Sequence, residues 1–244
     1  MIILIWHLSI KLFKIESFIL PEPYRVLTTM IQRSTELMNA CFITASAALL
    51  GLLFSLIIGY SIALLFSLSD WLEKGLYPLA LFFQTVPIVA VAPLIILWVG
   101  QGFYGVMTVA LILSVFPIIS GATTGLTRLP NSYLELFELY KSNTIKRMLY
   151  LQIPHSLPNV IAGLRVSSGL AVIGAIIGEF SAGYGQGNSG LGYYILASSG
   201  NLKTDLLFAS IITSTIMGWL IFISIDRLGN MLLSTFHMNQ TKVK

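Results

Sequence analysis

Charged side chains are scarce in this chain of 244 residues: they make up 10% of it, while hydrophobic residues make up 56%. Soluble domains carry about 25% charged residues because their surface must face water. The mean hydropathy of +0.85 points the same way. These values exclude a soluble globular domain and predict an all-α polytopic protein whose solvent is the lipid bilayer.

Residues that carry chemistry are also few. The single cysteine, Cys41, lies in an apolar run, which excludes an internal disulfide and indicates a small buried hydrophobe. The three histidines stand alone without ligand spacing, so no metal is predicted. No Gly-Lys pair occurs, which excludes a phosphate loop of the Gly-x-x-x-x-Gly-Lys-Ser/Thr type. We therefore predict that the chain binds no ATP, holds no cofactor and is not an enzyme.

Basic residues form no stripe that would indicate a nucleic-acid partner, although the net charge is +4. They stand singly between apolar runs, where membrane topology explains them. With the polar block 128–152 and the C-terminus in the cytoplasm, eight Lys and Arg fall inside and five outside. Because Lys and Arg concentrate on the cytoplasmic side, we expect this orientation in the cell inner membrane.

Long charge-free runs separated by short polar turns mark the membrane spans. We divide the chain into a short N-terminal helix with a linker, residues 1–37, and a transmembrane domain, residues 38–244. Residues 1–10 are too few to cross and follow no basic region, so we expect a short, tilted or truncated first helix and no cleaved signal peptide. About six transmembrane helices are predicted in all, with a polar loop at 128–154 and five spans near 38–68, 76–99, 103–127, 157–181 and 205–226.

Two ionisable residues, Arg165 and Glu179, fall within one predicted span, about 21 Å apart along a helix axis. Such residues usually face the bundle interior or a water-filled cavity, which makes both candidates for the substrate pathway. The alternative is that each reaches the interface or closes a helix–helix contact. Arg165 lies near the cytoplasmic end and fits a brace for the polar loop. A negative Glu179 near the external mouth disfavours a dedicated anion pathway.

Two further segments are candidates for the pathway or its gate. Gln84, Thr85 and Pro87 lie in a predicted span where proline frees backbone carbonyls, which favours either a lining role or interhelical hydrogen bonds. The glycine-rich segment 183–200 is either a flexible external loop or part of a gate. Its relevant glycines are at 183, 185, 187, 190 and 192.

The polar block 128–152 has apolar residues at helical spacing in two stretches, which predicts two short amphipathic helices. Residues 141–144 form the expected turn between them, and Pro154 is expected to close the block. An apolar helical face in the cytoplasm indicates docking of another protein. The alternative is a locally packed loop.

Several motifs together resemble the permeases of binding-protein-dependent ABC importers. The resemblance to the "EAA" loop of that family is carried by Glu135-Leu136-Phe137, Lys141-Ser142, Ile153-Pro154 and Gly163-Leu-Arg165. Stretches around Pro21, Gln84, Ser189 and Asp226 are similar to one branch, which imports nitrate, sulfonates, taurine, bicarbonate and pyrimidine-type vitamin precursors. The order and spacing of these motifs extend the resemblance over nearly the whole chain.

The resemblance implies a six-helix permease that pairs with a second permease, usually a second copy of itself, as a dimer. It also implies ABC ATPase subunits on the cytoplasmic side, which bind the ATP, and an extracytoplasmic substrate-binding protein. The EAA-type hairpin would then be the coupling element that docks on the ATPase. The residues assigned to coupling are Glu135, Leu136, Phe137, Lys141, Ser142, Asn143, Ile153 and Pro154.

The segment Ser189, Gly190 and Gly192 resembles the outer gate of the family. It joins the other candidates for the pathway or gate, which are Gln84, Thr85, Pro87, Arg165 and Glu179.

The chain departs from the family pattern at two alanines, here Leu136 and Phe137, and at the turn glycine, here Lys141. The bulkier pair requires a matching groove on the ATPase. A left-handed backbone at Lys141 costs about 1–2 kcal/mol, so Asn143 is the alternative turn residue. Glu135 either takes part in coupling or only complements the helix dipole, which is worth about 0.3–1 kcal/mol.

Two other classes of function stay open on the sequence. A self-contained carrier or channel more often shows two related halves, and no clear internal repeat is found here. A membrane scaffold without transport fits the intramembrane Arg165, Glu179 and prolines poorly. The sequence does not predict which substrate is transported.

Overall fold

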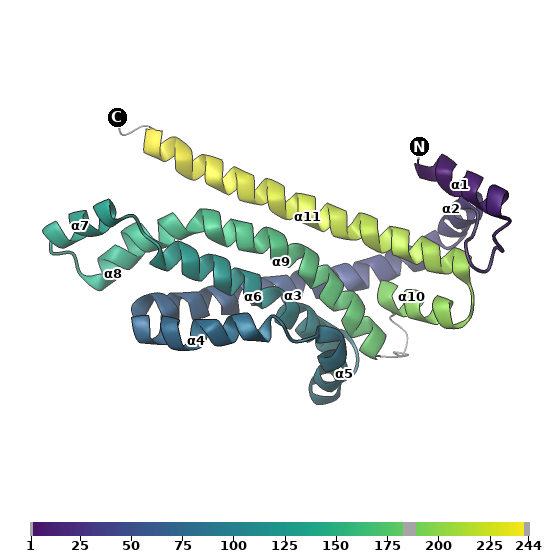
Figure 1. The fold of residues 1–244 in the computed structure, drawn as a ribbon, viewed down its shortest axis with the longest axis horizontal. Helices are drawn as coiled ribbons and strands as arrows, with labels where there is room; N and C mark the ends of the chain where they lie inside the picture. Colours follow the sequence, from purple (N-terminus) through teal and green to yellow (C-terminus); the bar gives the residue numbers. More distant parts are fainter. Residues whose placement is uncertain (1, 183–188, 242–244) are drawn as a thin grey trace. The chain divides into compact units, whose positions relative to one another are not determined.

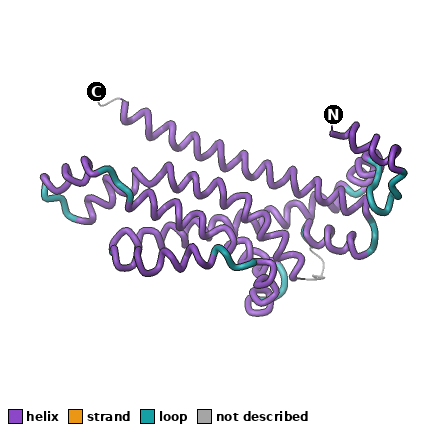
Figure 2. The backbone as a smooth tube through the Cα atoms, viewed as in Figure 1, coloured by secondary structure: helices purple, strands orange, loops and turns teal. Residues whose placement is uncertain are grey.

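The computed structural model describes residues 2–182 and 189–241, and every regular element within them is a helix (Figures 1 and 2). The predicted all-helical class is therefore confirmed for the described residues, and Gly183, Gly185 and Gly187 of the predicted loop lie outside them. In chain order the helices are α1 (Ile2–Phe13), α2 (Pro23–Gln32), α3 (Ser34–Leu68), α4 (Asp70–Phe83), α5 (Ile88–Val99), α6 (Phe103–Thr127), α7 (Asn131–Leu139), α8 (Thr144–Arg147), a π-helical turn (Met148–Gln152), α9 (Ile153–Ala182), α10 (Leu191–Gly200) and α11 (Thr204–Thr241).

Four helical segments are long and apolar enough to cross a membrane. The pair α4–α5 adds a fifth when it is counted as one bent span, and the apolar helix Leu4–Phe13 is shorter than a span. By length and composition, the described residues thus hold four or five candidate spans. This number is lower than the predicted total of about six. The four segments are Ser34–Leu68, Phe103–Thr127, Thr144–Ala182 and Thr204–Thr235.

The segment predicted as one span near 76–99 is divided into two helices, with residues 84–87 between them. Pro87 explains the break, because proline has no amide hydrogen and disfavours a helical backbone in the residue before it. The span predicted at 103–127 has the bounds of α6, and the other three predicted spans lie within longer helices. The helix predicted at 157–181 starts upstream at Thr144, and the last helix continues to Thr241.

The described residues fall into two units with separate internal contacts. Unit 1 is drawn from Met1–Ala48, Ile88–Val109 and Val172–Leu220. Unit 2 is drawn from Leu49–Pro87, Ala110–Ala171 and Ile221–Lys244. The long helices α3, α6, α9 and α11 contribute residues to both units.

Helices of unit 2 pack closely because small residues face one another. A Cβ atom placed on Gly121 would lie 2.5 Å from the Asn159 carbonyl oxygen, and one on Gly125 would lie 2.7 Å from Ser156 Cα. Small residues that bring backbones together in this way are typical of helix contacts within membranes. The apolar core beside this contact contains Ala63, Ala122, Leu126 and Val160.

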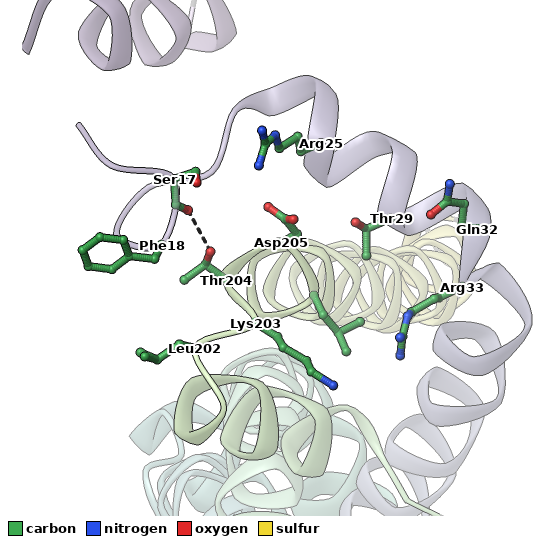
Figure 3. Close-up of a pocket in the computed structure, with 11 residues that line it drawn as sticks. Ser17, Phe18, Arg25, Thr29, Gln32, Arg33, Leu202, Lys203, Thr204 and Asp205 are labelled. Atoms are coloured by element: carbon green, nitrogen blue, oxygen red, sulfur yellow. Dashed lines mark hydrogen bonds between the residues drawn. The ribbon is translucent and has the colours of Figure 1, made fainter. Parts of the chain in front are cut away.

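In unit 1 the N-terminal helices lie beside the first turns of α11 (Figure 1). The rings of Trp6 in α1 and Phe208 in α11 have centroids 5.7 Å apart. The Thr204 hydroxyl donates a hydrogen bond of 2.9 Å to the Ser17 carbonyl, which fixes the α1–α2 linker to the start of α11 (Figure 3). Val26 of α2 is 1% exposed, so this helix is part of the packed unit.

Candidate coupling hairpin and pathway residues

Helix α7 ends in a Schellman turn whose left-handed residue is Lys141, at a φ of 46°. The Lys141 amide donates to the Glu138 carbonyl at 2.8 Å, and the Ser142 amide donates to the Phe137 carbonyl at 3.0 Å. These two bonds define the motif, and its left-handed position is usually glycine. The structure thus places the turn at the position predicted by the family pattern, although a lysine occupies it.

Asn143 is not the left-handed turn residue that the sequence offered as an alternative. Its backbone is extended, with a φ of −72° and a ψ of 154°, and its side-chain oxygen accepts a 2.6 Å hydrogen bond from the Ile145 amide. This is the geometry of a helix N-cap, which satisfies an amide that the helix itself cannot pair. Asn143 therefore starts α8, and the alternative in which it supplies the left-handed turn is wrong.

The hairpin formed by α7 and α8 presents much of its apolar surface rather than burying it. Glu135 is exposed, and Phe137 is half-buried. Large apolar side chains on both helices are also exposed, and soluble surfaces rarely expose such a group unless it binds something. They are Leu136 at 48%, Leu139 at 79%, Tyr140 at 77% and Ile145 at 59%.

Pro154 does not end the polar block, as the sequence led us to expect, but lies in a continuous helix from Thr144 to Ala182. The residues Met148–Gln152, shortly before Pro154, form a π-helical turn. The Ile153 amide donates to the Met148 carbonyl, which lies five positions earlier in the chain. Proline lacks an amide hydrogen and its ring crowds the preceding turn. A π-helical turn is a known way for a helix to absorb such a disturbance. The hairpin is therefore continuous with a membrane span.

Two polar side chains at the start of this long helix bind the end of α6. Gln152, which is 5% exposed, donates from Nε2 to the Leu126 carbonyl at 3.2 Å. His155 Nδ1 lies 3.2 Å from the Gly125 carbonyl, and because a carbonyl only accepts, the nitrogen carries the hydrogen. The last carbonyls of a helix have no partner within it, so these two contacts satisfy groups that would otherwise be unpaired.

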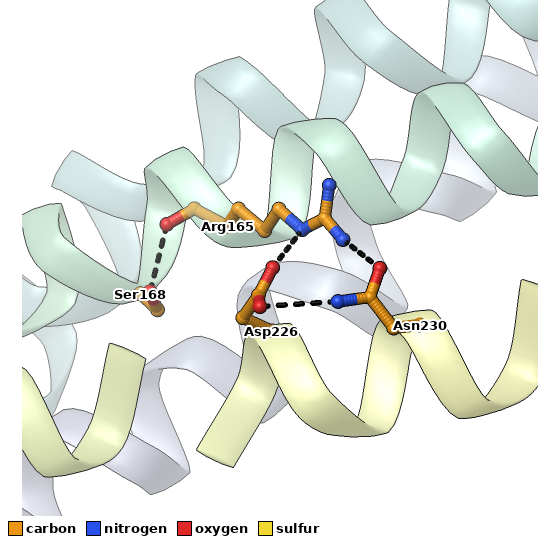
Figure 4. Close-up of polar contacts among 4 residues, drawn as sticks. All are labelled: Arg165, Ser168, Asp226 and Asn230. Carbon is orange, nitrogen blue, oxygen red and sulfur yellow. Dashed lines mark hydrogen bonds and ion pairs between the residues drawn. The ribbon is translucent and has the colours of Figure 1, made fainter. Parts of the chain in front are cut away.

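Arg165 lies in a polar cluster that joins α9 to α11 within unit 2 (Figure 4). Its Nε lies 2.7 Å from Asp226 Oδ1, as an ion pair without hydrogen-bond alignment, and its Nη2 donates to Asn230 Oδ1 at 2.6 Å. Asn230 in turn donates to Asp226 Oδ2 at 3.1 Å. The cluster closes a helix–helix contact, which was one of the two possibilities for Arg165.

Glu179 is buried, at 6% exposed, and its carboxylate caps the start of α10 within unit 1. Oε2 accepts from the Gly192 amide at 2.6 Å, and Oε1 lies 2.8 Å from the Thr44 hydroxyl. The same hydroxyl accepts from the Leu191 amide at 2.8 Å. A negative charge at a helix N-terminus is favourable because the unpaired amides carry partial positive charge.

The glycines of the proposed gate segment are required by their closeness to Glu179. A Cβ atom on Gly190 would overlap the carboxylate, and one on Gly192 would lie 2.7 Å from the Ile176 carbonyl oxygen and 2.8 Å from Glu179 Oε2. Gly190 and Gly192 are buried, and Ser189 beside them is half-buried. The structure therefore brings Glu179 together with Gly190 and Gly192, which belong to a segment that the sequence analysis treats as a separate candidate.

Helix α10 also carries two adjacent tyrosines, Tyr193 and Tyr194, whose ring centroids lie 5.6 Å apart. Burial raises the pKa of Tyr194 above its ordinary value, and the negative Glu36 acts in the same direction. Tyr194 therefore stays neutral and keeps its hydroxyl proton near neutral pH.

Gln84, Thr85 and Pro87 occupy the break between α4 and α5, and all three are exposed. The Thr85 hydroxyl donates to the Phe82 carbonyl at 2.7 Å, so it bonds within its own turn. Within the described part of the chain, none of the three forms an interhelical hydrogen bond.

Sequence reasoning missed the residues that complete each of these clusters. Thr44 carries no signal in a charge-free run, since threonine is common inside membrane helices. Gln152 was visible as an amide in an apolar stretch, and Asp226 as an acid near the end of a span, but nothing indicated their partners. Asn230 pairs with Arg165, which lies 65 residues away in the sequence.

Comparison with known proteins settles the class. Residues 51–235 match the family described as the inner membrane component of binding-protein-dependent transport systems. The chain belongs to this family. It is therefore the membrane permease subunit of an ABC importer, it is non-catalytic, and a partner ATPase hydrolyses the ATP. The self-contained carrier or channel and the membrane scaffold are thereby excluded.

Individual relatives cover nearly the whole permease. The formylaminopyrimidine transport permease of Halalkalibacterium halodurans is 32% identical over 240 residues, which is 96% of this chain and 92% of that protein. The riboflavin transport permease of Chloroflexus aurantiacus is 31% identical, with 87% of this chain and 79% of that protein covered. A putative aliphatic sulfonates permease of Escherichia coli is 26% identical, with 99% and 92% covered.

Proposed function

We propose that the α7–α8 hairpin of this permease lies in the cytoplasm and docks on the ATPase subunit as its coupling element. Family membership supports an ATPase partner, and the exposed Leu136, Leu139 and Tyr140 supply an apolar surface for it. Bulky residues in place of the two family alanines imply a wider groove on the partner. The chain itself binds no nucleotide in this proposal, because it has no phosphate loop.

The continuity between the hairpin and a membrane span carries the proposal. Helix α8 continues through the π-helical turn into α9 without a break, so a displacement of the hairpin moves the start of the span Thr144–Ala182. Gln152 and His155 bind the same region to the end of α6. Packed elements with fixed hydrogen bonds move together rather than deform, which suits the transfer of motion from an ATPase to the membrane.

A matched pair of substitutions tests the coupling role. Glu135 and Glu138 are both exposed on α7, but only Glu135 matches the family motif. In the reconstituted importer, Glu135→Ala should lower substrate-stimulated ATP hydrolysis several-fold, while Glu138→Ala should leave it near the parent value. Unchanged stimulation in Glu135→Ala rejects the coupling role and leaves only the effect on the helix dipole.

We further propose that α1 is the sixth membrane helix and that residues 38–244 form the transmembrane domain around the coupling loop 128–154. Twelve residues at about 1.5 Å each make roughly 18 Å, less than the bilayer core of about 30 Å. Helix α1 must therefore tilt or be extended by neighbouring residues. The side chains of Leu4, Leu8 and Leu12 are 71%, 58% and 71% exposed, which suits contact with lipid.

Single cysteines placed at positions 5 and 16 test this crossing with a thiol reagent that does not cross the membrane. Labelling of the two positions from opposite sides would support a crossing, and labelling of both from the same side would exclude it.

A second copy of the chain is the partner we infer within the membrane. The exposed Leu97 and Trp98, at 75% and 76%, and the break at Gln84 and Thr85 are surfaces that such a copy or the pathway would cover. Two permeases per complex, measured by mass in detergent, would agree with this proposal. A single copy or a second, different permease would overturn it.

The candidate pathway residues separate into two groups in this proposal. Gln84, Thr85 and Pro87 line the pathway, because they are exposed and lie where a span is broken. Glu179 with Gly190 and Gly192 holds the outer segment in place, and Arg165 braces α9 against α11. Since Glu179 is buried in a cap, its charge no longer argues against an anionic substrate.

The substrate class we infer is a heterocyclic vitamin or vitamin precursor, delivered by an extracytoplasmic binding protein. Two relatives above 30% identity are named for formylaminopyrimidine and riboflavin transport. Calorimetric titration of the cognate binding protein with pyrimidines, flavins, sulfonates and nitrate tests this choice. Binding of a sulfonate or of nitrate alone would replace the inferred class.

A further inference from the structure

A polar cavity of 380 Å³ lies in unit 1, between the α1–α2 linker, helix α2 and the connection from α10 to α11 (Figure 3). Its volume is within the range of about 300–1,000 Å³ that small-ligand sites occupy. None of the candidate coupling, pathway or gate residues lines it. The cavity is therefore a feature that the function of the hairpin and the gate does not use.

Positive charge dominates the lining of this cavity. Arg25, Arg33 and Lys203 stand against the single carboxylate of Asp205, which leaves a formal charge of +2. In Figure 3 Arg25 and Asp205 lie toward one end of the lining, and Lys203 and Arg33 lie toward the other end and come from different elements. Positive charge therefore exceeds negative charge among the lining residues.

Arg33 also forms an ion pair with Glu36, outside the lining, at 3.3 Å. Both side chains are exposed, at 43% and 51%. Exposed pairs of this kind hold weakly because water and salt screen them. Arg33 therefore remains able to bind an anion in the cavity.

The cavity lies at the ends of two membrane spans. Arg33 directly precedes Ser34, the first residue of one candidate span, and Lys203 directly precedes Thr204, the first residue of another. At about 1.5 Å per residue, the 35 residues of Ser34–Leu68 extend roughly 52 Å, which exceeds the 40–45 Å or so of a bilayer with its headgroups. Both cations are therefore expected at headgroup level, where basic side chains meet lipid phosphates.

The backbone around Lys203 is fixed before any ligand arrives. Helix α10 ends in a second Schellman turn, with Leu202 at a φ of 55°, and the Lys203 amide donates to the Ser198 carbonyl at 2.9 Å. The bond from Thr204 to Ser17 holds the opposite wall. Beside this polar wall the apolar Phe18 and Leu202 are 55% and 69% exposed.

We propose that this cavity binds the phosphodiester headgroup of an anionic glycerophospholipid. Arg33 and Lys203 bind the phosphate, and hydroxyl groups of a glycerol headgroup donate to Asp205. The exposed Phe18 and Leu202 lie where the acyl chains begin. A phosphate at headgroup level with adjacent apolar contacts favours a lipid over a soluble anion, and the net positive charge favours an anionic lipid over a zwitterionic one.

The test measures the thermal unfolding midpoint of the full, delipidated chain in neutral detergent as single lipids are added. Phosphatidylglycerol should raise the midpoint more than phosphatidylethanolamine or phosphatidylcholine does. In Arg33→Gln combined with Lys203→Gln, the phosphatidylglycerol concentration for half the effect should rise about tenfold or more. The matched control, Lys11→Gln with Lys14→Gln, removes the same charge from exposed cations of unit 1 outside the lining and should respond like the parent.

Several results would overturn the proposal. Equal effects of the three lipids, or an unchanged response in the Arg33 and Lys203 variant, would exclude a selective headgroup site. An equal effect of inorganic phosphate at the same concentration would indicate a free-anion site. Loss of binding of the cognate substrate-binding protein, with the lipid response unchanged, would make the cavity a protein-docking site. If the double variant does not unfold cooperatively, native mass spectrometry of Lys203→Gln decides, with reduced retention of phosphatidylglycerol expected.

Discussion

The Glu179 carboxylate accepts a 2.6 Å hydrogen bond from the Gly192 amide, so a residue near the end of one span caps the helix that follows it. Thr44 of α3 joins the same cap through the Leu191 amide. Three segments of unit 1 thus meet at one buried carboxylate. The position of α10 depends on this contact more than on its own sequence, since α10 has only ten residues.

Replacing Glu179 by alanine should destabilise α10. The Gly192 amide would lose its partner in a buried place, at a cost of about 1–3 kcal/mol. Glu179→Gln should lose less, because its amide oxygen can still accept one bond. The thermal unfolding midpoint of the purified permease, with cysteine accessibility on α10, measures the effect. Glu16→Ala, on an exposed acid of unit 1, is the control and should be near neutral; equal stability of Glu179→Ala would show that the cap is dispensable.

Gly192→Ala should be more harmful than alanine at Gly200, the other glycine of α10. The added methyl group would lie 2.7 Å from a backbone oxygen, which cannot move out of the way without shifting a span. Overpacking of this kind typically costs about 1–3 kcal/mol. Gly200→Ala is the matched control, because its Cβ meets nothing within 4 Å. A neutral Gly192→Ala in the same unfolding assay would contradict the close packing described.

Lys141→Gly should stabilise the hairpin and leave ATPase docking intact. Glycine removes a left-handed cost of about 1–2 kcal/mol and brings an entropy cost of about 0.5–1 kcal/mol, so a net gain of up to about 1.5 kcal/mol is expected. Lys146→Gly, in the helical part of the hairpin, should instead lose about 1 kcal/mol. Co-purification with the ATPase and complex melting measure both. Complete loss of assembly in Lys141→Gly would show that the lysine side chain, rather than the turn, is required.

The pair Arg165 and Asp226 should show a modest coupling energy. Their side chains are 31% and 36% exposed, so water screens part of the attraction, and about 1 kcal/mol is expected. A double-mutant cycle with Arg165→Gln and Asp226→Asn, read by thermal unfolding, isolates the pairwise term. The same cycle on Arg33 and Glu36 should give a smaller value, because that pair is more exposed. Additive effects at Arg165 and Asp226 would show that the ion pair contributes nothing to stability.

Composition and charge-free runs were enough to predict the class of the fold. The run before Asp70 and the polar block after Thr127 end helices in the structure near the positions where the sequence changes character. The sequence predicts one span through Pro87 and the end of the polar block at Pro154. In the structure the helix breaks at Pro87 and continues through Pro154. A proline marks a disturbance, but only the neighbouring turns decide whether the helix stops or absorbs it.

The contacts that organise the site could not be predicted from the sequence. Thr44 and Glu179 are separated by 135 positions, and nothing local to either names the other. Spacing did predict a turn at Lys141, because the family pattern fixes its distance from Glu135. The pairing of Gln152 with the end of α6 depends on tertiary packing, which a single sequence does not encode in any local pattern.

The π-helical turn also bears on the angular phase between the hairpin and the span. It holds about one residue more per turn than an α-helix, so the additional residue is absorbed within a single turn. Loss of one residue between 148 and 152 would therefore return the segment to regular winding and leave the hairpin facing nearly the same side of the span. Loss of one residue from the regular part of α9 would instead rotate the hairpin by roughly 100° about the helix axis.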